Sequence, residues 1–395
     1  MVSVPYYRRV GEVPRKRHSQ FRRPDGQLYT EELVGEQGFF YASSLLYHRD
    51  SPNIILAAEP VDLPALQPER LPNVPLQPRM FQTGDITAGG DVVTGRQCFL
   101  LNENLRLSCV VADAPSPLFR DAMGDELVFV QEGTARLETL YGVLDVSTGD
   151  YVRLPMGCVH RWIPGRDGVR VLVMEATGHI QIPNRFVSPR GQFLEHAPYS
   201  ERDFRGPTEP YVVDDEETEV LVKHRDGVTR HTFAHHPFNV VGWDGTVYPW
   251  AFSIYDYEPT VKRFHIPPAS LETFTGPGWV VCSLTPRPAD FDPESIPAPY
   301  AHSNLDCDET LLFVSGNYTI RQGTAIGAGS MTFHPAGWVH GPHPGGAEAS
   351  IGKPAHEEYA VMIDTFTPLS LGPSAASIAD PDYYRSWADH PARTS

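Results

Sequence analysis

From residue 97 onward, the chain alternates short apolar runs with turn residues. The runs are rich in β-branched and aromatic side chains, and glycine, asparagine, aspartate and serine separate them. They include CFLLNENLRLSCVVAD, ELVFVQEG, TARLETLYGVLDVSTGD, YVRLP and VRVLVME. Short runs of this composition and spacing are typical of the strands of a β-barrel. The pattern therefore predicts a first barrel at residues 97–177.

The remaining regions are arranged around a second barrel, predicted at residues 240–367. Residues 1–96 are predicted to form an N-terminal arm and an extended segment, because prolines recur from Pro60 to Pro78 and exclude long helices. Residues 178–239 connect the barrels, and residues 368–395 form a tail with one short helix at most. With 38 prolines and 33 glycines, the chain is predicted to be all-β with little helix.

Two blocks of sequence occur twice. DELVFVQEG at Asp125–Gly133 matches DETLLFVSG at Asp308–Gly316, and in each an Asp-Glu pair precedes an apolar run. GDYVRLPMGCVH at Gly149–His160 matches GSMTFHPAGWVH at Gly329–His340, with glycine, proline, glycine and histidine in step. Such internal similarity indicates two similar β-barrels in tandem.

Candidate metal ligands lie in the second copy. His302, Glu309 and His340 offer two imidazoles and one carboxylate, a set that binds Fe(2+) by one face and leaves the opposite positions open. The proline and glycine before His340 can turn the chain so that this histidine returns beside the carboxylate. Alternatively, these residues are hydrogen-bonded core histidines and a solvated glutamate. Asp308 is the rival carboxylate, but Glu309 has the repeat's spacing to the following glycine.

Two other groups of possible ligands are weaker candidates. His231, His235 and His236 form a histidine cluster, but no cysteine or well-spaced carboxylate accompanies it to complete a zinc site. Cys307 lies beside the candidate ligands, yet a site of nitrogen and oxygen donors does not need it, and a small buried thiol is the simpler reading.

The charge balance limits the classes of partner. The chain has 32 basic and 49 acidic residues and a net charge of −17, which disfavours nucleic acid and anionic membranes. No run of apolar residues is long enough to cross a membrane, and no signal peptide opens the chain. Five cysteines without a CxxC pair predict reduced thiols and a cytoplasmic protein. The basic cluster in the first twenty-three residues is expected to lie on an acidic surface of this or another subunit.

The repeated blocks resemble the two motifs of the cupin superfamily, so the duplication makes the chain similar to a bicupin with two jelly-roll-like barrels. The usual first motif carries a histidine, any residue and a second histidine before the glutamate, whereas this chain has His302, Ser303 and Asn304. The resemblance thus implies a three-ligand site in the second barrel. The first barrel retains only Glu126 and His160 and is expected to be metal-free.

More specifically, the chain resembles the homogentisate 1,2-dioxygenase family. The similar segments are LYTEELVGEQGFF and SSLLYHR near the start, VVGWDGTVYPW at Val240–Trp250, and PYAHSNLDCDE, SGNYTIRQG and HPAGWVHGPH around the candidate ligands. The resemblance implies that His302, Glu309 and His340 hold iron, and one extra residue lies between His302 and the carboxylate.

Further roles follow from the same resemblance. His265 in VKRFHIPPASLETF corresponds to the family's acid/base histidine. Tyr300 and Tyr318 correspond to tyrosines of the substrate pocket. His334 corresponds to a histidine beside the ligands and is placed with the substrate-binding residues, and Asn304 is expected to orient the ligands with it.

Two positions depart from the family pattern. Arg321 stands where the family usually has a lysine, and because arginine binds a carboxylate with two prongs, it is expected to hold the acid side chain of the substrate differently. His343 stands at a position that is often acidic. Both departures concern the identity of the substrate more than the class of reaction.

The resemblance implies an Fe(2+)-dependent enzyme that opens the ring of homogentisate with O2 to give 4-maleylacetoacetate, in phenylalanine and tyrosine breakdown. It also implies a homo-oligomer, a hexamer by analogy. Two alternatives are open at this point: a ring-cleaving bicupin for a related dihydroxybenzoate such as gentisate, and a bicupin that is not an oxygenase, either an isomerase or a small-molecule binding protein.

Overall fold

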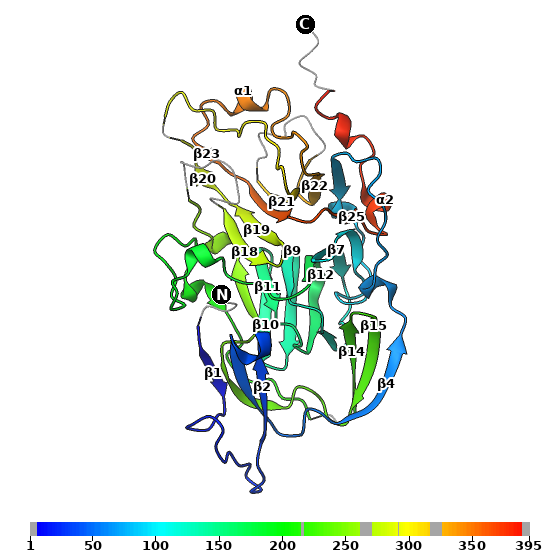
Figure 1. Ribbon diagram of the computed structural model, residues 1–395, viewed down its shortest axis with the longest axis vertical. Coiled ribbons are helices and arrows are strands. Elements are labelled where there is room, and N and C mark those ends of the chain that lie inside the picture. Colours follow the sequence, from blue (N-terminus) through cyan, green and yellow to red (C-terminus); the bar gives the residue numbers. More distant parts are fainter. Residues whose placement is uncertain (1–5, 215–216, 261–270, 291, 317–325, 389–395) are drawn as a thin grey trace. The chain divides into compact units, whose positions relative to one another are not determined.

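A computed structural model describes residues 6–214, 217–260, 271–290, 292–316 and 326–388. Strands dominate it (Figure 1), and the described residues contain two short α-helices, α1 (Gly346–Ser350) and α2 (Ala375–Ile378). The prediction of an all-β chain with little helix is confirmed. Single 3₁₀ turns lie at Gln37–Phe39, Pro64–Leu66, Thr83–Asp85, Asn184–Phe186, Glu201–Asp203, Ile254–Asp256 and Tyr383–Arg385.

The chain divides into two compact units. The first unit comprises Met1–Pro68, Ala88–Gln97 and Leu107–Ser253. The second unit comprises Glu69–Thr87, Cys98–Arg106 and Ile254–Ser395. This division differs from the expected boundaries at residues 97 and 240, because pieces of the N-terminal third of the chain supply strands to the second unit.

The first unit contains two sheets. The smaller sheet has the order β1 (Arg8–Gly11), β16 (Val240–Gly245), β3 (Ser43–His48), β2 (Thr30–Gly35). The main sheet has the order β13 (Phe204–Arg205), β17 (Trp250–Ser253), β11 (Asp150–Leu154), β9 (Glu126–Thr139), β12 (His160–Ala176), β8 (Phe119–Asp121), β14 (Thr218–His224), β15 (Gly227–Phe233), β4 (Ile55–Val61). β10 (Gly142–Ser147) pairs with β9, and β7 (Leu105–Ala112) pairs with β12.

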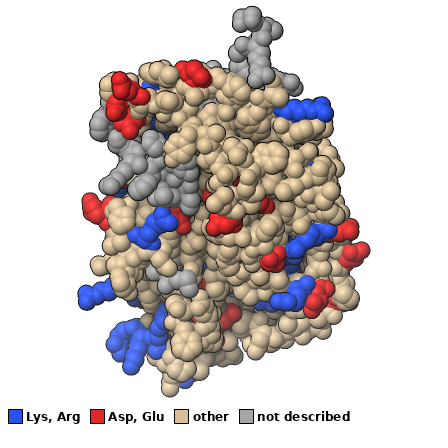
Figure 2. Space-filling view, turned by 45° about the horizontal axis from the view of Figure 1, so that its top comes forward, with Lys and Arg blue, Asp and Glu red and all other residues tan. Residues whose placement is uncertain are grey.

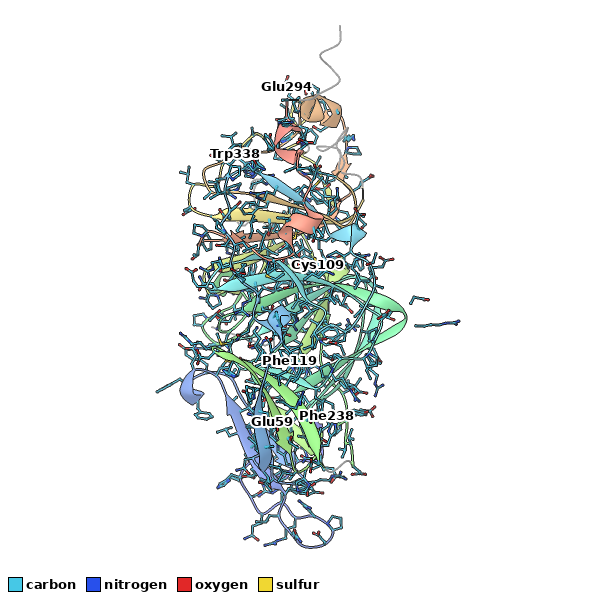
Figure 3. The ribbon with its side chains drawn as sticks, turned by 90° about the vertical axis from the view of Figure 1, so that its right-hand side faces the viewer. Glu59, Cys109, Phe119, Phe238, Glu294 and Trp338 are labelled. Atoms are coloured by element: carbon cyan, nitrogen blue, oxygen red, sulfur yellow. The ribbon has the colours of Figure 1, made fainter. Side chains whose placement is uncertain are left out.

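Alternate residues of β9 and β12 build the core of the first unit. Val128 and Val130 on β9 and Val171 and Val173 on β12 are fully buried in one cluster, because alternate side chains of a strand point to the same face. Burial of one such valine contributes about 1.5–3 kcal/mol. Phe119, labelled in Figure 3, is buried among the same side chains.

The N-terminal arm lies on acidic residues of its own unit. β1 pairs with β16, and the Arg17 Nε atom is 2.5 Å from Asp244 Oδ1 on that strand. Arg23 is 3.7 Å from Asp50. On the face drawn in Figure 2, Lys and Arg side chains lie among Asp and Glu side chains.

None of the helices in the described part of the chain has the length and apolar character needed to span a bilayer.

The second unit is built on a sheet with the order β18 (Glu272–Gly276), β19 (Trp279–Leu284), β24 (Tyr359–Thr365), β21 (Asp308–Ser315), β22 (Ser330–His334), β5 (Arg79–Gln82). Short pairs join β20 (Arg287–Pro288) to β23 (Ala355–His356) and β25 (Ser370–Leu371) to β6 (Gln97–Leu101). β5 comes from early in the chain and pairs with β22, where its Met80 and Phe81 are buried.

Two glycines of the repeat have backbone angles that residues with a side chain disfavour. Gly157 has φ 81° and Gly337 has φ 75°, in the left-handed region that side chains disfavour. Each lies three residues before a histidine, His160 and His340. The same backbone turn therefore delivers a histidine to the interior of both units.

Candidate metal centre

The structure brings His302, Glu309 and His340 together in the second unit. Glu309 is on β21, and the two histidines form an isolated backbone bridge in which each N–H donates to the other residue's carbonyl at 2.8 Å. One potential ligand atom from each of the three side chains lies within 4.8 Å of the others. The Nε2 atom of His340 is 3.2 Å from Glu309 Oε1, and that of His302 is 3.9 Å from Oε2.

Backbone carbonyls orient both imidazoles. The Nδ1 atom of His302 is 3.0 Å from the Tyr300 carbonyl oxygen, and that of His340 is 3.0 Å from the Trp338 oxygen. A carbonyl only accepts, so each Nδ1 donates its proton, and Nε2 is the ring nitrogen that faces the centre. The Nε2 atom of His340 is buried and makes no hydrogen bond.

These donors fit a divalent metal ion. Nitrogen and oxygen ligands lie about 2.0–2.2 Å from a first-row ion such as zinc, so donors at right angles are about 3 Å apart. Two imidazoles and one carboxylate are the set found in non-haem Fe(II) oxygenases. Burial by itself would raise the pKa of Glu309, but the adjacent His302, His334 and His340 rings lower it well below its usual value. The carboxyl group is therefore ionised, as a ligand must be.

The contacts of Asp308 distinguish it from Glu309. One oxygen of Asp308 accepts the Ala336 N–H at 2.8 Å, and the other accepts the Leu369 N–H at 2.7 Å. Both oxygens are thus engaged by the backbone, whereas the oxygens of Glu309 face the imidazoles. This geometry supports Glu309 as the carboxylate of the centre.

His334 and Asn304 contact the carboxylate from outside the three donors. His334 Nδ1 is 3.2 Å from Glu309 Oε1, and its ring stacks on the His340 ring with centroids 4.1 Å apart. Asn304 Nδ2 donates to Glu309 Oε2 at 3.4 Å. Such outer contacts orient ligands and tune their affinity.

The other predicted site residues are less well placed or lie outside the described residues. The Tyr300 side chain is 63% exposed. The backbone carbonyl of Tyr300 orients the His302 ring. His265, Tyr318 and Arg321 lie outside the described residues. His343 is buried, and its Nε2 atom is 2.8 Å from Ser386 Oγ.

Exposed apolar side chains lie near the two histidines in the sequence. Trp338 lies at the surface (Figure 3), and Leu305 and Val339 are also exposed. Cys307 is buried, and burial raises the pKa of its thiol to about 12, so the thiol stays protonated. Within the described residues, neither Cys307 nor the cluster of His231, His235 and His236 belongs to a group of converging ligand atoms.

In the first unit, the equivalent place is filled by protein cations. Asp121, Glu126 and Glu175 bring three carboxylates within 4.8 Å of one another. Arg96 binds Glu126 through two nitrogens, at 2.6 and 3.1 Å, and lies 2.9 Å from Glu175. Lys223 is 2.6 Å from Asp121 and also contacts Glu175.

The sequence analysis missed two side chains of the second unit. Asp364 on β24 lies opposite Glu309, and burial, followed by the charge of Glu309, raises its pKa well above its usual value. The repeat carries a signal for it, since Glu126 faces Glu175 in the same way on β12. Tyr383 contacts His334 from the C-terminal tail, and no sequence pattern announces it.

The comparison with known sequences found dioxygenases. A family model described as the N-terminal part of homogentisate 1,2-dioxygenase matches residues 61–254. A protein of Saccharolobus solfataricus, provisionally named a dioxygenase, is 32% identical over 97% of this chain and 99% of its own length. Homogentisate 1,2-dioxygenases of Bradyrhizobium diazoefficiens and Emericella nidulans are 26% and 25% identical over 68% and 69% of this chain. The matches cover 62% and 64% of those two enzymes.

The comparison with solved structures found cupins. A cupin 2 conserved barrel domain protein of Leptotrichia buccalis is 9% identical, with a TM-score of 0.36 over 73% of this chain and 96% of that protein. An oxalate decarboxylase variant of Bacillus subtilis is 13% identical, with a TM-score of 0.33 over 74% of this chain and 79% of that protein. These scores are low, and nothing about the site follows from them.

Proposed function

Because this bicupin chain belongs to the homogentisate 1,2-dioxygenase family, as its sequence motifs predicted, we propose that it is an Fe(2+)-dependent ring-cleaving dioxygenase. Its substrates are proposed to be homogentisate and O2, and its product 4-maleylacetoacetate, in phenylalanine and tyrosine breakdown. The relatives support a dioxygenase, and the identity of the aromatic acid is part of the proposal.

The observation that carries the proposal is the convergence of His302, Glu309 and His340 on one buried centre. These three side chains would hold the iron, and His340 contributes a buried nitrogen that has no hydrogen bond of its own. When bound, ferrous iron supplies adjacent coordination positions for an aromatic diol and for dioxygen. Holding both reactants at one place supplies the proximity that the reaction needs.

The chain's other side chains are assigned to positioning and proton transfer. His334 and Asn304 hold the Glu309 carboxylate in place through the contacts at 3.2 and 3.4 Å. His265 is proposed to take the phenol proton of the substrate, a role suited to a side chain that titrates near neutrality. Tyr300, Tyr318 and Arg321 are proposed to bind the aromatic acid, with Arg321 on its carboxylate.

Oxygen uptake tests the reaction and the substrate together. The protein is purified anaerobically, loaded with ferrous iron, and offered homogentisate or gentisate in air while oxygen and the absorbance of the ring-opened product are followed. We expect uptake with homogentisate. Uptake with gentisate alone would replace homogentisate by a related dihydroxybenzoate, and no uptake with either at full iron loading would favour a bicupin that is not an oxygenase.

A matched pair of variants tests which unit carries the reaction. His340→Ala removes a proposed ligand, and we expect activity to fall by more than about 100-fold, beyond the loss that removal of an outer partner of a ligand causes. His160→Ala alters the same position of the repeat in the first unit and is expected to leave activity nearly unchanged. Comparable losses in both variants would contradict the assignment of the iron to the second unit.

Two coarser properties complete the proposal. The protein is proposed to be cytoplasmic, since all five cysteines are buried thiols outside any disulfide, as in a reducing compartment. It is also proposed to be a homo-oligomer, a hexamer by analogy with the family. Light scattering of the purified protein measures the second property directly.

A further inference from the structure

The C-terminal tail reaches the centre through His334. Tyr383, in the 3₁₀ turn Tyr383–Arg385, is 2% exposed, and its hydroxyl oxygen is 3.1 Å from His334 Nε2. The other ring nitrogen of His334 is 3.2 Å from Glu309 Oε1. The three side chains therefore form a line of contacts from the tail to the carboxylate.

Aromatic packing holds this turn in place. The Trp387 ring stacks on the His343 ring, with centroids 4.4 Å apart and 13° between the planes. The same indole packs by its edge against Tyr383 at 5.4 Å and against His334 at 6.1 Å. Ser386 Oγ is 2.8 Å from His343 Nε2. The tail is thus anchored at several points on the second unit, and these contacts fix the position of the Tyr383 hydroxyl.

The line of contacts selects one form of the His334 ring. A neutral imidazole has one N–H and one lone pair. If the Tyr383 hydroxyl donates to Nε2, the ring proton must sit on Nδ1, where it donates to the Glu309 carboxylate. In the opposite tautomer, the Nδ1 lone pair would face a carboxylate oxygen, and the two would repel. The carboxylate, which can only accept, therefore selects the first tautomer, and the Tyr383 hydroxyl holds the ring in it by donating to the remaining Nε2 lone pair.

The first unit shows that this arrangement is not a general feature of the fold. Leu154 is paired with Glu126 there, in the register position that His334 occupies opposite Glu309. Glu126 is instead held by Arg96. A histidine at this register position, contacted by a buried tyrosine, occurs in the unit whose carboxylate faces two imidazole lone pairs.

We propose that Tyr383 is a positioning residue of the metal centre. Its hydroxyl donates to His334 Nε2 and holds the ring in the orientation in which Nδ1–H donates to Glu309, which fixes the carboxylate for the metal ion. The C-terminal turn is then a working part of the centre. This inference rests on the metal-binding role of Glu309 under the proposed function, and it does not depend on which aromatic acid is turned over.

The test uses Tyr383→Phe in the full-length protein, which removes the hydroxyl and keeps the ring. Tyr384→Phe is the matched control, because Tyr384 is the neighbour in the same turn and is 38% exposed. Anaerobic competition titration measures the affinity for Fe(2+). We expect Tyr383→Phe to bind the ion about 10- to 100-fold more weakly, the range for loss of an outer partner of a ligand. We expect Tyr384→Phe to bind it as the wild type does.

A second measurement needs neither metal nor substrate. Nitrogen-15 NMR of histidine-labelled, metal-free protein reports which ring nitrogen of His334 carries the proton, with His334→Gln to assign the signal. The wild type should show protonated Nδ1 and an unprotonated Nε2 whose signal is shifted by the hydrogen bond from Tyr383, and Tyr383→Phe should lose that shift. Protonated Nε2 in the wild type, or unchanged affinity and an unchanged Nε2 signal in Tyr383→Phe, would overturn the inference. Failure of the wild type to bind iron would instead count against the proposed function.

Discussion

The two units place a glutamate at the same point of corresponding strands and surround it with different chemistry. Glu126 opens β9 and receives the Arg96 guanidinium through two hydrogen bonds. Glu309 is the second residue of β21 and faces the imidazoles of His302 and His340. In the first unit the protein supplies its own cation, whereas in the second unit two imidazoles and one carboxylate converge as possible ligands of a metal ion.

The frame around both glutamates is nevertheless the same. Asp125 accepts the backbone N–H groups of Met156 and Ile180, each at 2.7 Å, as Asp308 accepts two backbone N–H groups in the second unit. His160 Nδ1 is 3.0 Å from the Cys158 carbonyl, the same two-residue offset seen at His340. The comparison teaches that the backbone delivers the glutamate and the histidine in either case, and that neighbours from other segments decide what the pair binds.

Charge balance explains why Arg96 stays ionised beside the buried carboxylates of the first unit. Burial disfavours the charge of Arg96, but Glu126 and then Glu175 raise its pKa, so the guanidinium stays ionised. Burial lowers the pKa of His160, and the nearby Glu126 only partly offsets this. His160 is therefore neutral, and its neighbour Glu126 is already paired with Arg96.

The largest expected effect is the loss of the internal cation. Arg96→Met leaves the buried Glu126 carboxylate without its two-pronged partner and removes one of the two cations beside Glu175, and breaking a buried pair in this way costs about 3–5 kcal/mol. Urea unfolding measures the change in the free energy of unfolding. Arg230→Met is the control, because Arg230 on β15 pairs with the exposed Glu59 and Glu219 at 3.8 and 3.5 Å, a type of contact that contributes about 0–1 kcal/mol. Equal costs for the two variants would mean that Arg96 does not balance the cluster.

A smaller effect separates the units by their response to metal. Ferrous iron at 100 times its dissociation constant should stabilise the unit that binds it by about 2.7 kcal/mol. Anaerobic hydrogen exchange with mass spectrometry should show slower exchange in peptides from β21 and β22 and no change in peptides from β9 and β11. His340→Ala should abolish the protection. Equal protection of β9 would show that the first unit also binds the ion.

The smallest expected effect concerns the frame of the first unit. Burial by itself would raise the pKa of Asp125, but Arg153, His179 and the Ile180 N–H outweigh it and lower the pKa. A lowered pKa in the folded state means that the carboxylate stabilises the fold above its unfolded pKa of about 3.9 and that this stability is lost as the pH falls through the folded value.

Asp125→Asn should therefore destabilise the protein at pH 7 and much less at low pH. We expect about 1.5 kcal/mol at pH 7, because Arg153 keeps Glu36 as a partner at 2.9 Å while the asparagine amide must turn its NH2 group toward one of the N–H donors. Urea unfolding of both proteins between pH 7 and pH 2.5 measures the difference. A cost that is the same at every pH would show that the charge of Asp125 is not what matters.

Some site residues could be predicted because their signals are local. The Asp-Glu pair before an apolar run, and the glycine three residues before His340, set strand and turn within a few residues, and the structure brings His302, Glu309 and His340 together. Asp364 carried a weaker signal through its counterpart Glu175. Arg96, Lys223 and Tyr383 had none, because each reaches its partner from a separate stretch of chain.

The sequence by itself determined the strands, the duplication and the residue types that could bind a metal, since apolar alternation and glycine turns act over short distances. Only the tertiary structure decided that β5, from early in the chain, completes the sheet of the second unit. It also decided that Asp308 is held by backbone N–H groups while Glu309 faces the imidazoles. The physical reason is that the charge a buried carboxylate meets depends on strand register and on side chains from distant segments.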